Sequence, residues 1–76
     1  MTASELQSLL IAQLVRIAGG SPRQWRIAIG PIRLHDPATH AHCNWSIAPS
    51  GSVREVAKIE KLLDTVRLTH PIVVTG

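Results

Sequence analysis

Two segments in which side-chain character alternates residue by residue, WRIAIGPIRL at residues 25–34 and HCNWSI at residues 42–47, set the architecture expected of this chain. In the first segment Trp25, Ile27 and Ile29 occupy alternate positions, which predicts one apolar face of a β-strand. Gly30-Pro31 interrupts the strand. Beyond them the alternation continues shifted by one residue, at Ile32 and Leu34, as a β-bulge would cause.

The second segment predicts a partner strand. Cys43, Trp45 and Ile47 share one face, whereas His42, Asn44 and Ser46 share the other. The connection from His35 to Ala41 contains the turn signal Asp36-Pro37. The two strands are therefore expected to form an antiparallel hairpin with both tryptophans on its apolar face, in the core, and with Arg26, Asn44 and Ser46 on its polar face. The alternative is that the tryptophans mark a ligand pocket or an interface with a partner chain.

Helices are predicted on either side of the hairpin. Thr2-Ala3-Ser4-Glu5 is a capping box that opens a helix running to Ala18, and Gly19-Gly20 ends it. Ser52-Val53-Arg54-Glu55 is a second capping box, opening a helix that runs to about Thr69. Its core stripe is expected to comprise Val56, Ile59, Leu62, Leu63 and Val66.

The expected fold is therefore a single small α+β domain over residues 1–76, in the order helix, strand, strand, helix, with both helices on one face of a two-stranded antiparallel hairpin. The tail Ile72–Thr75 is either a short third strand or an extended arm docked on a neighbouring chain. The apolar stripe of the first helix spans about half its circumference, more than so small a sheet covers. This surplus predicts a homodimer.

The amino-acid composition restricts the cellular compartment in which the protein is expected. The chain has a net charge of +3, one cysteine, two tryptophans and no Phe or Tyr. No segment approaches the roughly 18 uninterrupted apolar residues of a membrane span, so no membrane association is expected. The single cysteine excludes an internal disulfide, and the first twenty residues do not resemble a secretion signal, so we expect a cytoplasmic protein.

Three histidines near the hairpin loop suggest a metal site. His40 and His42 project to the same side of an extended segment, and the turn at Asp36-Pro37 would bring His35 across from them. Three nitrogen ligands and an open position are typical of catalytic zinc, so a metal-dependent hydrolase or nuclease is one hypothesis. The alternative is a polar loop whose imidazoles bond to the backbone, with no cofactor.

Basic residues suggest a nucleic-acid partner. Arg26 and Arg33 lie along the first predicted strand, and a row of basic residues follows one side of the second long helix at Arg54, Lys58 and Lys61. The element order resembles a shortened double-stranded-RNA-binding fold, or the small endoribonuclease toxins built on it. The resemblance is one of architecture, because the basic cluster and the glycine-and-histidine signature of those families are absent, and no residue role is carried over.

No catalytic residue is assigned. Cys43 shares a face with Trp45, which favours an inert buried thiol, and there is no phosphate-binding glycine loop or Ser-His-Asp order. An enzyme is therefore not the leading expectation. The leading expectation is a self-associating binding or accessory module with a protein partner. A nucleic-acid-binding protein is the alternative, and the metal-dependent hydrolase comes third.

Overall fold

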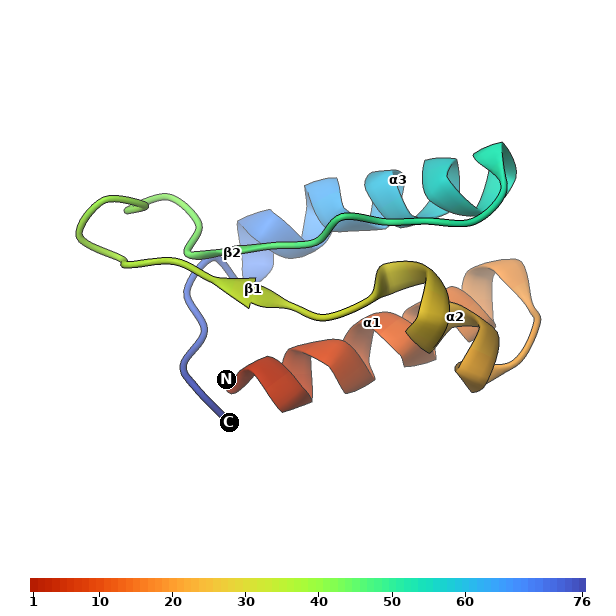
Figure 1. Cartoon of the computed structure of the whole chain (residues 1–76), viewed down its shortest axis with the longest axis horizontal. Helices are drawn as coiled ribbons and strands as arrows, with labels where there is room; N and C mark the ends of the chain where they lie inside the picture. Colours follow the sequence, from red (N-terminus) through yellow and green to blue (C-terminus); the bar gives the residue numbers. More distant parts are fainter.

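The computed structural model describes all residues 1–76 and confirms the α+β fold class, with the order helix, strand, strand, helix and an antiparallel hairpin (Figure 1). It also contains one helix that the sequence pattern does not predict. The elements are α1 (Ala3–Ala18), α2 (Pro22–Ile29), β1 (Arg33–Leu34), β2 (Trp45–Ser46) and α3 (Val53–Thr69).

Both predicted long helices are confirmed together with their capping boxes. The Thr2 hydroxyl accepts from the Glu5 amide, and the Glu5 carboxylate accepts from the Thr2 amide. Ser52 and Glu55 repeat the arrangement at α3. Each box satisfies amides that the helix itself leaves without partners, which explains why the helices begin where they do.

The strand predicted over Trp25–Ile29 is wrong, because these residues form the second half of α2. Ser21 is the N-cap, and its hydroxyl accepts from the Gln24 amide. Pro22 stands at the start of the helix, where its missing N–H costs nothing. Gly30 ends it at a φ of 63°, which glycine adopts without strain.

The buried face of α2 follows helical spacing instead of alternation. Trp25, Ala28 and Ile29 are buried at positions i, i+3 and i+4, whereas Ile27 is 66% exposed. Gly30 and Pro31 accordingly mark a helix end and the approach to β1, not a bulge within a strand.

The hairpin is consequently shorter than predicted. Arg33 pairs with Ser46 and Leu34 with Trp45 in an antiparallel register. Trp45 and Ile47 are buried as expected, and Cys43 packs against the core. Asn44, predicted on the polar face, is buried instead, because its side-chain amide donates to the Val73 carbonyl and its side-chain oxygen accepts from the Val73 amide.

One core joins all the elements. It contains both tryptophans, the apolar stripes of α1 and α3, and the buried face of α2; its partly buried margin includes Val15 and Leu62. α1 and α3 run antiparallel (Figure 1). Because α2 packs on α1, it covers much of the wide stripe that the sequence pattern assigns to a second copy, and Ile17 is the large apolar residue of that stripe that stays mainly exposed.

The C-terminal tail docks on its own chain. Val73 is buried, and a single parallel bridge joins Thr2 to Val74. The Val74 and Gly76 carbonyls accept from the Ala3 and Ser4 amides, which α1 leaves unpaired. The tail is thus neither a full third strand nor an arm on a neighbour, and it brings the two termini together (Figure 1).

Candidate binding groove

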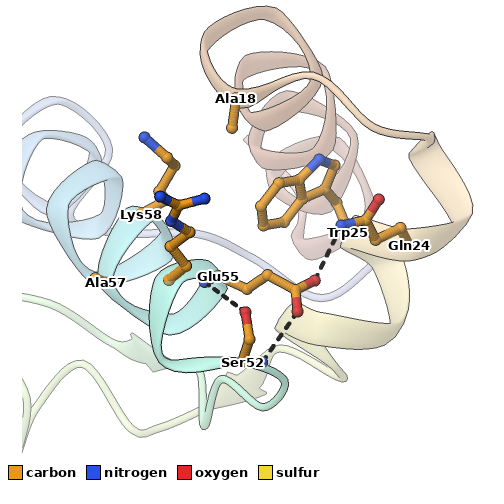
Figure 2. Close-up of a pocket in the computed structure, with 8 residues that line it drawn as sticks. Ala18, Gln24, Trp25, Ser52, Glu55, Ala57 and Lys58 are labelled. Atoms are coloured by element: carbon orange, nitrogen blue, oxygen red, sulfur yellow. Dashed lines mark hydrogen bonds between the residues drawn. The ribbon is translucent and has the colours of Figure 1, made fainter.

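An open groove of about 620 Å³ lies where α2 meets the beginning of α3 and the end of α1. In Figure 2, Gln24 and Trp25 come from α2, Ser52, Glu55, Ala57 and Lys58 come from the start of α3, and Ala18 closes the side formed by α1. Arg54 completes the lining. The groove therefore combines a small apolar surface with two basic side chains, and Trp25 lines it while almost wholly buried.

Trp25 is held firmly as part of this groove. Its indole N–H donates to the Gly19 carbonyl at 2.7 Å, and only 2% of the residue is exposed. Gly20 lies against the same side chains at a φ of 84°, and a Cβ there would collide with the Gln24 side-chain oxygen. Because L side chains rarely adopt this φ, glycine is the residue that allows the α1–α2 connection to turn here.

Glu55 is the acidic residue of the groove, and its carboxylate is already engaged. One oxygen accepts from the Ser52 amide and the other from the Gln24 side-chain amide (Figure 2). The Ser52 backbone, followed by the Gln24 and Ser52 side chains, lowers the pKa of Glu55 below its ordinary value. Glu55 is thus a helix cap and a bridge from α3 to α2, and it stays ionised at neutral pH.

A second depression continues along α3. It encloses about 370 Å³ between Ile17 of α1 and the α3 residues Lys58, Lys61, Leu62 and Thr65. Lys58 lines both hollows, so they adjoin at this side chain. Ile17, 56% exposed, supplies an apolar wall beside the half-buried Leu62.

The structure brings together three of the five basic residues predicted to bind nucleic acid. Arg54, Lys58 and Lys61 line the two adjoining hollows. None of the three forms an ion pair, since the single salt bridge of the chain joins Arg67 to Asp64. The three cations are therefore free to meet an anionic ligand.

The other two residues predicted to bind nucleic acid, Arg26 and Arg33, lie outside these hollows. Arg26 lines a separate hollow between α1 and α2, and Arg33 is exposed on β1. The five residues consequently do not form one continuous basic face. The sequence pattern predicts the α3 row, but it places Trp25 on a strand in the core and does not predict Gln24 as a groove residue. The signal for these two groove residues is the helix start at Ser21-Pro22, because it predicts the helix that carries Gln24 and Trp25.

Two of the three histidines predicted as zinc ligands lie side by side. The His35 and His40 rings stack with 4.6 Å between centroids. His35 Nε2 bonds to the Ser46 hydroxyl, and His40 Nδ1 to the Thr39 hydroxyl. His42 is exposed and does not join them, and no three His, Cys, Asp or Glu side chains are grouped to hold a metal ion. The zinc site stays a prediction that this arrangement does not support.

Cys43 is a half-buried free thiol whose sulfur donates to the Trp45 carbonyl. That contact orients the thiol along the hairpin, and Cys43 lies outside the groove.

No helix has the combination of length and apolar character needed to cross a bilayer. In comparisons with known proteins, no protein family, no curated protein and no solved structure matches the chain.

Proposed function

We propose that this chain is a small binding module that holds an anionic partner along α3. The binding surface consists of the two hollows that adjoin at Lys58, and together they are called the groove of α3. The observation that supports the proposal is the convergence of Arg54, Lys58 and Lys61, all without acidic partners, on hollows that also carry apolar surface. A built concavity with a few convergent charges is what ligand recognition requires.

Binding accounts for this groove better than catalysis does. Its carboxylate, that of Glu55, is occupied by two donors, and the Ser52 hydroxyl accepts from the Glu55 amide. No thiol or imidazole lines it. The groove therefore lacks a nucleophile paired with a free base, the arrangement on which covalent or acid–base catalysis depends.

A binding experiment at low ionic strength tests the proposal. Polyglutamate and a mixed-sequence RNA oligonucleotide serve as polyanion probes for the wild-type protein, for the double variant K58E/K61E and for the control variant R33E. We expect the wild type to bind at least one probe, with an affinity that falls as salt is added, because exposed charges are screened. We expect K58E/K61E to lose this binding and R33E to retain most of it.

Two results would contradict the proposal. One is the absence of binding to both probes by the wild-type protein at low salt, where electrostatic attraction is strongest. The other is a loss of binding free energy in K58E/K61E that is no more than twice the loss in R33E. The double variant lowers the net charge by four and R33E by two, so such a ratio would mean that overall charge, not the groove, attracts the probes.

Self-association is a separate proposal with its own support. Ile27 on α2 is a large apolar side chain left mostly in solvent, and each strand of the hairpin has only two residues. A second copy could cover Ile27 and extend the sheet, although α2 has already buried much of the α1 stripe. Sedimentation at high micromolar concentration tests this: a dimer is expected, and a monomer would exclude the homodimer.

We place the module in the cytoplasm. The support is compositional: the sole cysteine carries a free thiol, and free thiols are kept reduced in that compartment.

A further inference from the structure

We infer that the occupant of the groove of α3 is an acidic amphipathic helix from a different protein, an inference that rests on the proposed function. The shape of the groove is the first argument. It runs along α3 from Ser52 to Thr65, which is about 20 Å at roughly 1.5 Å per residue. Antiparallel α1 and α3 form its sides over the second hollow, as in complexes where a helix lies in a groove.

The spacing of the charges is the second argument. Arg54, Lys58 and Lys61 follow one another at i, i+4 and i+7, so their side chains form one row on the exposed side of α3. A helix lying along this row presents matching carboxylates when its acidic residues repeat with the same period. Electrostatic complementarity of this kind sets orientation and partner choice.

The apolar wall is the third argument. Ile17 projects from α1 into the hollow that holds Lys58 and Lys61, and Leu62 lies half-buried beside it. A helix with an apolar residue next to its acidic row would cover Ile17 and remove it from water. An amphipathic partner therefore uses both the charged and the apolar surface of the groove.

Nucleic acid fits the same groove less well. The chain has no Phe or Tyr, and both tryptophans are buried with their indole N–H groups donating to backbone carbonyls, so nucleobases find no aromatic surface on which to stack. A nucleic acid in this groove would also place a phosphate next to the Glu55 carboxylate, because phosphates repeat at regular intervals along its backbone. The two negative charges would repel each other. A peptide helix can place a neutral residue there.

A second copy of this chain does not supply the required helix. Its five acidic residues are Glu5, Asp36, Glu55, Glu60 and Asp64. Glu5 and Glu55 are engaged in capping boxes, and Asp64 pairs with Arg67. No helix of the chain therefore offers a free row of three carboxylates, and the occupant must come from another protein.

The test uses three fluorescently labelled probes with the full-length chain at low salt. The first is a helical peptide of about 14 residues, long enough to span the groove, with Glu at i, i+4 and i+7 beside leucines. The second has the same composition with the glutamates spread around the helix, and the third is a single-stranded RNA oligonucleotide. Fluorescence anisotropy measures the affinity of each probe for the wild type, K58E/K61E, I17S and the control R33E.

We expect the amphipathic peptide to bind about tenfold more tightly than the scrambled peptide and more tightly than the RNA. K58E/K61E should weaken its binding about tenfold or more, and I17S about fivefold, which is what the loss of one partly buried apolar contact amounts to. R33E should change it less than twofold. Ile17 is mainly exposed, so circular dichroism should show that I17S remains folded.

The outcomes separate the two proposals. RNA that binds more tightly than the amphipathic peptide, in a manner dependent on Lys58 and Lys61, overturns the helix inference and leaves the anion-binding function intact. Equal binding of both peptides, or no effect of I17S, also overturns the inference. The absence of binding to all three probes contradicts the inference and the proposed function together.

Discussion

Asn44 is the one buried polar residue of the chain, with 4% of its surface exposed. Its amide makes a pair of hydrogen bonds to the Val73 backbone, at 2.7 and 2.8 Å, and so fixes the C-terminal tail to the hairpin. Alternation in the sequence predicts an outward-facing residue here. It cannot reveal the tail, because the partner lies 29 positions away and consists of backbone, which every sequence possesses.

We predict that N44A lowers the free energy of unfolding by about 2–6 kcal/mol. The substitution leaves the Val73 N–H and C=O without partners in a buried place, and each such group costs about 1–3 kcal/mol. Urea denaturation measures the change. The neighbouring exposed residue provides the control, since H42A should lie within about 0.5 kcal/mol of wild type. An N44A midpoint equal to that of wild type would show that these two hydrogen bonds contribute nothing to stability.

At the scale of elements, α1 and α3 could be predicted with their boundaries because their caps are local. The hydroxyl, the acidic residue and the amides they satisfy all lie within one turn, so four consecutive residues contain the whole signal.

The caps also predict a pH dependence. Hydrogen bonds from Thr2 and from Ser52 lower the pKa of Glu5 and of Glu55 below the ordinary value of 4.5. A carboxyl whose pKa is lower in the folded state stabilises the protein above the unfolded pKa, and this stabilisation is lost as the pH falls through the folded pKa. We expect the stability of the wild type to fall below about pH 4.5, and that of E5Q/E55Q to fall less. Parallel pH profiles for the two proteins would contradict the capping role.

Side-chain patterns do not predict α2, because two patterns overlap in the same residues. Trp25, Ile27 and Ile29 alternate as in a strand, while Trp25, Ala28 and Ile29 also share one face of a helix. With five residues, periodicity does not distinguish the two. The end signals do: Ser21-Pro22 and Gly30 are start and stop residues for a helix, and both act on the backbone directly.

A pair of substitutions distinguishes a helix from a strand at residues 25–29. In the helix Ile27 is exposed and Ala28 is buried, whereas in a strand their positions would be reversed. We predict that I27E changes the free energy of unfolding by less than about 0.5 kcal/mol and that A28E destabilises the protein by more than about 3 kcal/mol, since it places a charge in the core. Thermal and urea unfolding provide the measurement. A larger destabilisation by I27E than by A28E would indicate that this segment is a strand.

At the scale of the whole molecule, the groove depends on the element that sequence patterns missed. The row of Arg54, Lys58 and Lys61 could be read from helical spacing, but whether it faces open solvent or a concavity depends on where α2 and α1 pack. α2 contributes Gln24 and Trp25 to one hollow, and α1 contributes Ile17 to the other. A basic stripe thus became a candidate site only through tertiary packing.

The same packing also changes the argument for a dimer. The sequence pattern assigned the excess apolar surface of α1 to a second copy, yet α2 buries much of it within one chain. The large apolar side chains that remain exposed are distributed over separate places, including Ile17 in the groove, Ile27 on α2, and Val53 and Leu68 on α3. Self-association therefore has a smaller surface to use than the composition alone suggested.

Binding of the acidic amphipathic peptide in the groove of α3 can be mapped residue by residue with a two-dimensional ¹H–¹⁵N NMR titration of the chain. We predict that shift changes concentrate at Ile17 and Ala18, along residues 54–65 and at the Trp25 indole N–H, and that they weaken with added salt. Changes centred on Arg33 or on the histidine loop at residues 35–42, or an unchanged spectrum at saturating peptide, would contradict this prediction.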